Sequence, residues 1–170
     1  MSQEAQKTIP VKWFTPVQEE YVANAGITPG HLVELMSTGK VRVHATAGGN
    51  AEKTFALENE LEGQGINDAY AATDPVQVGI FRTGDVVLAM LVDDGTAATI
   101  GAYLESAGDG TLQVHVADTG DHSSAEAGGV TAVLPNQIVA IALEALDLSG
   151  SSGEESSDIL TTGRLLVRIV

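Results

Sequence analysis

The chain has 170 residues, of which 44% are hydrophobic, and this composition is typical of one globular domain or two very small ones. It has no cysteine, which excludes disulfides, thiolate zinc sites and cysteine nucleophiles. The net charge is −15 and the 8 basic residues are scattered, so the sequence argues against nucleic-acid and anionic-membrane partners, which require a basic patch.

Neither a leader nor a membrane span is expected. Residues 1–13 are polar and have no continuous apolar stretch, unlike a signal peptide. The mostly apolar run at residues 138–145, which includes Glu144, is too short to cross a bilayer. We therefore expect a soluble protein that is made in a cytoplasm.

The pattern of residues in chain order predicts a mainly β fold with little helix. Alternating or continuous apolar residues predict strands at 39–45, 74–80, 85–92, 111–116, 137–145 and 163–170. In the first of these, Val41 and Val43 should face inward, and Lys40, Arg42 and His44 outward. In the fourth, Leu112, Val114 and Val116 should face inward. Residues 17–24 and 55–61 are weak helix candidates, and the latter equally fits a strand that runs into a turn. The expected architecture is a small β-barrel or β-sandwich.

The sequence also contains an internal repeat. Residues 30–34 resemble 101–105 and residues 39–44 resemble 110–115, with one common offset, since 101 − 30 = 110 − 39 = 71. Further matches relate residues 55–58 to 141–144 and positions 76, 78 and 80 to positions 165, 167 and 169. The pattern indicates a duplication of about 27–80 as 98–169. The alternative is that small β-proteins commonly share glycine turns and alternating valines.

The expected domain organisation is an N-terminal arm at 1–24 followed by a single β-rich domain at 25–170. Within that domain, residues of about 119–133 form a small-residue acidic stretch, and residues of about 149–158 are rich in serine and glycine. Both compositions are typical of flexible, exposed loops.

No motif in the sequence indicates catalysis. The four histidines lack metal-ligand spacing, there is no nucleophile elbow, and no glycine-rich segment is followed by the lysine of a phosphate loop. His44 and His115 occupy matching repeat positions and are interpreted as solvent-facing strand residues. His122 with Asp118, Asp121 and Glu126 lacks calcium-loop spacing. We expect a protein that is not an enzyme and has no metal and no cofactor.

The N-terminal arm carries the clearest binding signal. Pro10 and Pro16 disfavour a helix between them, and an extended segment with large apolar side chains can add to the edge of a partner's sheet. The candidate binding residues are Ile9, Val11, Trp13 and Phe14. The alternative is that Trp13, the single tryptophan, packs on the protein's own core.

Several segments together resemble the capsid decoration, or head cement, proteins of tailed bacteriophages. These segments are residues 27–35, 39–49, 55–58, 70–78, 135–144 and 164–170. The resemblance covers about residues 25–170 and rests on turn and strand patterns.

The resemblance implies a structural virion protein that binds the outside of the expanded capsid and stabilises it against internal DNA pressure. It further implies a homotrimer at three-fold positions, the major capsid protein as partner, assembly in the host cytoplasm, and capsid contacts through the arm residues Ile9, Val11, Trp13 and Phe14. The repeat and its long loop depart from simpler members of the family, which leaves the oligomeric state open.

Two other functions compete with this one. The first is a phage fibre or spike module that binds carbohydrate or a host surface, which would need exposed aromatic residues. The second is a small β-barrel hydrolase, which would need a convergent serine or histidine site that the sequence does not suggest.

Overall fold

The fold is mainly β. The computed structural model describes residues 8–93, 95–116, 136–150 and 163–170. The strands in these ranges are β1 (Pro10–Lys12), β2 (Val17–Val22), β3 (Val33–Leu35), β4 (Val41–Val43), β5 (Thr54–Ala56), β6 (Pro75–Ile80), β7 (Val86–Met90), β8 (Tyr103–Ser106), β9 (Leu112–Val114), β10 (Ile138–Ala142) and β11 (Arg164–Ile169). One 3₁₀ turn, η1 (Glu60–Glu62), is the helical element of the described residues, none of which forms a helix that could cross a membrane.

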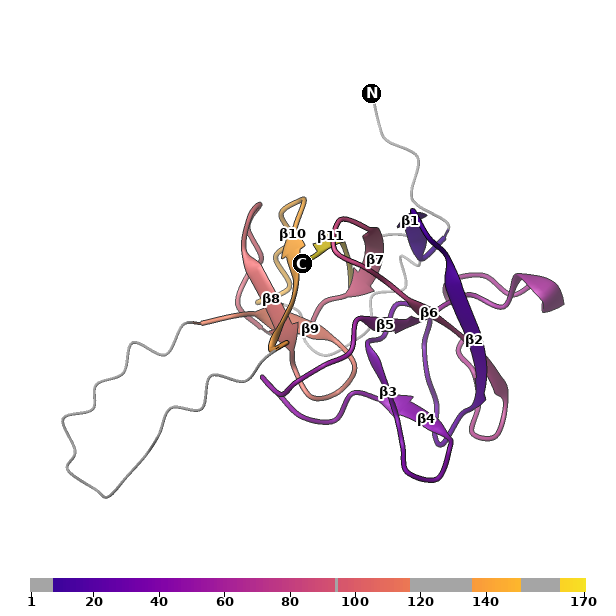
Figure 1. Cartoon of the computed structure of the whole chain (residues 1–170). Coiled ribbons are helices and arrows are strands. Elements are labelled where there is room, and N and C mark those ends of the chain that lie inside the picture. The colour runs from indigo at the N-terminus through magenta and orange to yellow at the C-terminus, as the bar shows by residue number, and fades with distance from the viewer. Residues whose placement is uncertain (1–7, 94, 117–135, 151–162) are drawn as a thin grey trace, which may run out of the picture.

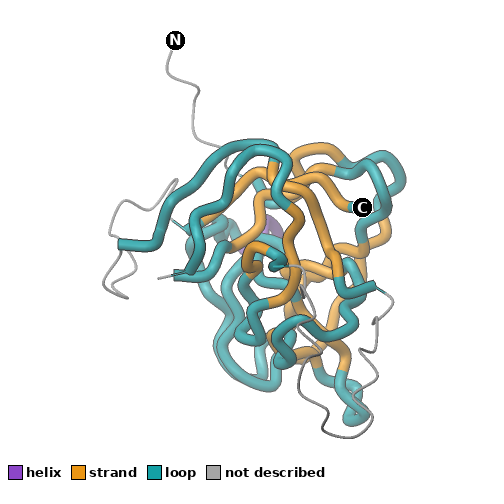
Figure 2. Tube along the Cα trace, turned by 90° about the vertical axis from the view of Figure 1, so that its left-hand side faces the viewer, coloured by secondary structure: helices purple, strands orange, loops and turns teal. Residues whose placement is uncertain are grey.

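The strands form three sheets in which each pair of neighbouring strands is antiparallel (Figure 1). The largest has six strands in the order β1-β7-β11-β10-β8-β9, and the others are β2-β6-β5 and the hairpin β3-β4. These sheets are open at their edges, so the architecture is sandwich-like rather than a closed barrel. Loops and turns connect the short strands over much of the molecule (Figure 2).

The six predicted strands are all present, with ends up to three residues shorter than the pattern suggested. The weak helix candidate at 17–24 is a strand instead, and for 55–61 the alternative of a strand that runs into a turn is confirmed. Residues 17–22 form β2, and the segment from residue 54 is strand β5 followed by the turn η1. Valine, tyrosine and phenylalanine in these segments favour the pleated conformation, and tertiary pairing outweighs local helix propensity.

The two hairpins have the matching registers that the internal repeat predicts. In the first, Glu34 is opposite Arg42, and in the second Glu105 is opposite Gln113, so 105 − 34 = 113 − 42 = 71. The same offset relates the residues on either side in each ladder. Gly39 and Gly110 have φ angles of 78° and 88°, a backbone conformation that favours glycine in such turns.

The remaining strands of the two repeats also correspond in register. Phe55 is opposite Gly79 and Ile141 is opposite Arg168, so the offsets are 141 − 55 = 86 and 168 − 79 = 89. Strand β2 lies against β6 as β7 lies against β11, because the pairs Glu20–Gln77 and Leu88–Leu166 are related by 88 − 20 = 68 and 166 − 77 = 89. The repeats therefore extend over 17–80 and 86–169, each beginning one strand earlier than the sequence predicted.

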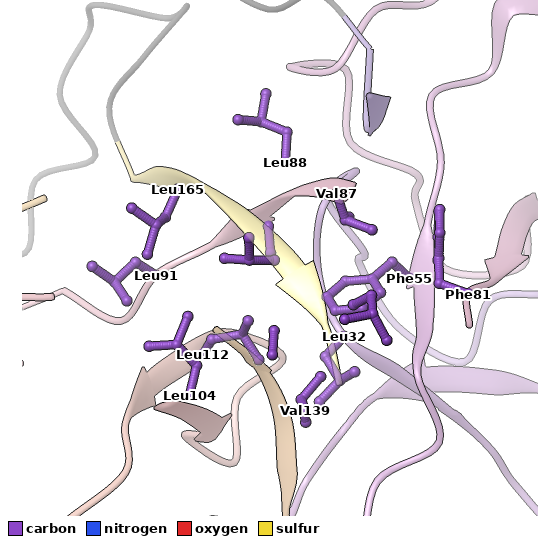
Figure 3. Packing of buried hydrophobic residues seen from close by; sticks show 14 of the residues in the cluster. Leu32, Phe55, Phe81, Val87, Leu88, Leu91, Leu104, Leu112, Val139 and Leu165 are labelled. Atoms are coloured by element: carbon purple, nitrogen blue, oxygen red, sulfur yellow. The ribbon is translucent and has the colours of Figure 1, made fainter. Parts of the chain in front are cut away.

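The two repeats share one large core. Its buried side chains include Leu32 and Phe55 from the first repeat and Leu104, Val139 and Leu165 from the second (Figure 3). A smaller core, which includes Ala23, Val33 and Val78, lies within the first repeat alone. Burial of these apolar surfaces is the main stabilising contribution to the fold.

Buried Arg164 links the second repeat to loops of the first. Its guanidinium donates hydrogen bonds to Asn67 Oδ1 at 2.9 Å, to the Pro29 carbonyl at 3.1 Å and to the Ile66 carbonyl. Several bonds from one fixed, planar charge hold strand β11 and these two loops together.

Two side chains point differently from the expected faces. His44 is buried, because β4 ends at Val43 and the next residue turns toward the second hairpin. Val116 is exposed, since β9 ends at Val114 and the chain leaves the sheet there. The predicted loop 119–133 lies outside the described residues, as does 149–158 except for Ser149 and Gly150.

Candidate interaction surface

The predicted N-terminal arm does not stand apart from the domain in its described part. Strand β1 pairs with the edge of β7, and β2 is the first strand of the first repeat. The Leu88 N–H donates to the Ile9 carbonyl at 2.9 Å, and the Ile9 N–H donates to the buried Glu58 carboxylate at 3.1 Å. The segment is extended, as its prolines predict, but the sheet edge that it joins belongs to its own chain.

The four candidate binding residues consequently differ in exposure. Ile9 is 0% exposed, and Val11 and Trp13 are half-buried against the large core. Phe14 is 65% exposed. Of the four, Phe14 is the residue that presents most of its side chain to a partner.

Trp13 belongs to an aromatic cluster of the large core. Its ring stacks on Phe81 with centroids 4.8 Å apart, and Phe81 meets Phe55 edge to face at 5.9 Å. Both geometries are those that aromatic pairs prefer. An open hollow beside Phe81 is lined by Asn50, Ala51, Glu52, Lys53, Ile80 and Asn136. It is unlike the enclosed apolar pockets that hold small molecules.

Phe14 is held in place although it is exposed. Its N–H donates to Asp85 Oδ1 at 3.0 Å, and Asp85 also accepts from the Arg82 N–H at 2.9 Å. The Lys12 ammonium lies 4.7 Å from the centre of the Phe14 ring, within the range of a cation–π contact. The pair offers an apolar and a basic group side by side on an otherwise acidic protein.

A serine and a histidine that are distant in sequence meet between the hairpins. His44 Nδ1 lies 2.7 Å from Ser106 Oγ, and Nε2 lies 2.9 Å from the Asn50 carbonyl oxygen. A carbonyl can only accept, so Nε2 carries a proton, and in the neutral ring Nδ1 then accepts from the serine hydroxyl. Ser106 is 0% exposed, and its oxygen also accepts from the Gly108 N–H. The contact has the composition of a nucleophile and its base, but it is closed to substrate and joins the hairpins.

The other two described histidines also have hydrogen-bond partners within the chain. His115 lies 2.5 Å from the buried Glu105 carboxylate, which accepts from Gln113 and Gln137 as well. His31 accepts a hydrogen bond from the Thr28 N–H, and burial lowers its pKa to about 4.

The described residues include no group of three or more metal-ligating side chains. The loop residues Asp118, Asp121, His122 and Glu126 lie outside the described ranges.

Strand β2 forms an edge that the sequence did not reveal. It ends the order β2-β6-β5, and Gln18, Glu19, Glu20 and Val22 on it are exposed. Glu19 accepts a hydrogen bond from the Tyr21 hydroxyl, and this bond, followed by burial and by the charges of Glu19 and Glu52, raises the pKa of Tyr21. The edge is therefore acidic, and within the described residues β4 meets it at its C-terminal end, where Val41 bridges Ala23.

Comparisons with known proteins identify the fold. No protein-family model and no curated protein sequence matches the chain. A solved structure, the N-terminal base of the head fiber protein gp8.5 of bacteriophage phi29, is similar with a TM-score of 0.51 at 11% sequence identity. The match covers 92% of this chain and 95% of that one. The two proteins thus share a fold over nearly their whole lengths.

Proposed function

We propose that the protein is a structural component of a tailed-phage virion that binds the outside of the head and stabilises the capsid. The observation that carries the proposal is the shared fold with a phage head fiber base, which extends over 92% of this chain. The resemblance of residues 25–170 to head decoration proteins supports it from the sequence. Fold alone does not determine function, so the shared fold and the sequence resemblance support the proposal jointly.

The chemistry of the described surface fits a binding role better than catalysis. Its serine–histidine contact is closed, its described histidines are bonded internally, and its exposed groups include the Phe14–Lys12 pair and the acidic edge of β2. Such features recognise a protein surface through apolar contact and charge complementarity.

The proposed assembly is a homotrimer at three-fold positions that contacts the major capsid protein. A weak contact made by each subunit becomes strong when three dock together, since the later contacts are intramolecular. Binding to the expanded lattice alone stabilises that lattice by mass action.

Co-sedimentation with phage heads tests the function. The purified full chain is mixed with expanded, undecorated heads and, as a control, with unexpanded proheads. Saturable binding to expanded heads, together with a higher temperature of DNA release, supports decoration and gives the number of copies per capsid. Absence of binding to both particles overturns the proposal, and binding to glycans instead would favour a host-surface module.

A further inference from the structure

The duplication provides an internal standard for judging whether a sheet edge is occupied. Strands β2 and β7 hold the same place in the two repeats, so each residue of β2 has a counterpart in β7 at an offset of 68, as 88 − 20 = 90 − 22 = 68. What covers the outer edge of β7 therefore indicates what the outer edge of β2 can accept.

The outer edge of β7 is covered by the chain itself. The Leu88 N–H donates to the Ile9 carbonyl at 2.9 Å, and the Met90 N–H donates to the Gly30 carbonyl at 3.0 Å. Strand β1 adds the pairs Pro10–Val87 and Lys12–Val86.

The outer edge of β2 has the same polarity, and within the described residues its backbone neighbour is Val41 of β4, which bridges Ala23 and accepts from the Asn24 N–H at 2.8 Å at the end of the strand. Ala23 donates its N–H across the ladder to Asp74, and the alternation of an antiparallel pair then turns the N–H groups of Glu20 and Val22 outward. No described residue accepts a hydrogen bond from either group, although their counterparts Leu88 and Met90 are both bonded.

The side chains along this edge select the class of occupant. Adjacent Glu19 and Glu20 are exposed and lie on opposite faces of the strand. Pairing of β2 with β2 of a second copy would bring these carboxylates together on a chain of net charge −15, which is unfavourable. A basic strand would instead meet opposite charges on both faces.

We infer that the outer edge of β2 accepts an extended, lysine- or arginine-bearing segment of the capsid protein as an added strand. This inference rests on the proposed function and names the surface of this chain that carries it. Backbone bonds from Glu20 and Val22 would provide the affinity, and the two glutamates would provide the preference for a basic partner.

Proline at position 22 tests the edge directly. Val22→Pro removes the outward N–H without touching the bonds to β6, and proline is tolerated at such edge positions. Val22→Ala removes the exposed side chain but keeps the N–H, and is the matched control. We expect Val22→Pro to weaken co-sedimentation with expanded heads roughly tenfold, and Val22→Ala to bind like the unaltered protein.

A charge variant gives an independent reading should Val22→Pro fail to fold. The double variant Glu19→Gln/Glu20→Gln should bind heads more weakly and with a smaller salt dependence, because it lacks the two charges whose attraction salt screens in the unaltered protein. Glu60→Gln/Glu62→Gln, on the exposed turn η1, is its control for overall charge and should bind normally.

The outcomes separate the two proposals. If the unaltered protein binds heads and the position 22 and glutamate variants bind equally well, the edge inference is overturned while the decoration role stands. If the unaltered protein binds no head, both are overturned. The inference is supported if the Glu20 and Val22 amides exchange fast in the free protein and become protected from hydrogen exchange on head binding.

Discussion

The two repeats have the same strand register but differ at their edges and in their surroundings. The first hairpin, β3-β4, stands as a separate sheet, whereas its counterpart β8-β9 continues a six-stranded sheet through β10. Strand β7 lies between β1 and β11, whereas its counterpart β2 is the edge strand of its sheet. The strand pairing within each repeat is thus retained although the sequences have diverged. The repeats differ in the strands that lie next to each of them in the sheets.

The largest loss of stability is expected on substitution of Arg164. The first repeat has no such arginine, because the counterpart of Arg164 there is Pro75, since 164 − 75 = 89. Arg164→Ala removes three hydrogen bonds from a buried charge. It should lower the free energy of unfolding by about 4 kcal/mol.

Arg168→Ala, at an exposed position of the same strand, should cost less than about 0.5 kcal/mol. Urea denaturation measures both variants. Similar losses for the two would show that Arg164 does not join the repeats.

The equivalent hairpin glycines form the second test. An alanine Cβ at position 110 would lie 2.8 Å from Val43 Cβ, whereas at position 39 it would meet nothing within 4 Å. Both positions have positive φ, so both variants carry backbone strain, but Gly110→Ala adds a clash. We expect losses of about 3 kcal/mol for Gly110→Ala and about 1 kcal/mol for Gly39→Ala. Thermal melting of both compares them, and equal shifts would contradict the different packing of the two turns.

The adjacent aromatics Trp13 and Phe14 test the cover on β7. Trp13→Ala removes the stack on Phe81 and should destabilise the protein by about 2 kcal/mol, because part of the ring is already solvated. Phe14→Ala should change stability by less than about 0.5 kcal/mol and instead reduce head binding. If Trp13→Ala melts like the unaltered protein, the segment 8–14 is not part of the fold in solution.

Much of the fold was predictable because periodicity reports burial. The strands around Val41, Val78 and Leu165 alternate or run apolar, and the hairpin glycines fix the register, so both the β class and the repeat were evident. Strand β2 was missed because Val17–Val22 contains Gln-Glu-Glu where β7 is apolar. An edge strand with two solvated faces loses the pattern that identifies a buried one.

The site was less predictable for a related reason. Sequence shows that a segment such as 9–14 is extended and apolar but not whether its partner lies in the same chain, so it does not distinguish a capsid contact of Ile9 and Trp13 from packing on their own core. Burial of His44 and its bond to Ser106 depend on residues separated by 62 positions, which no local pattern records. Only the fold brings such groups together.

The smallest predicted effect concerns the pH dependence of stability. It arises in the first repeat alone, because the counterpart of His31 in the second repeat is Ala102, at an offset of 102 − 31 = 71. Burial lowers the pKa of His31 to about 4, nearby Asp109 opposes this and Arg164 adds to it. In the unfolded chain His31 has an ordinary pKa near 6.5 and binds a proton below that pH, whereas in the folded protein it stays neutral down to about pH 4. The contribution of neutral His31 to the free energy of unfolding is therefore fully present above about pH 6.5 and is lost as the pH falls toward 4. Between pH 7 and pH 5 the loss should be about 1.5 kcal/mol. His31→Gln keeps an acceptor for the Thr28 N–H and cannot titrate, so its urea midpoint should fall less over the same range. Equal pH dependence of the two proteins would mean that the His31 side chain is solvated in the folded protein. The turn from Thr28 to His31, which precedes strand β3, would then be open to solvent.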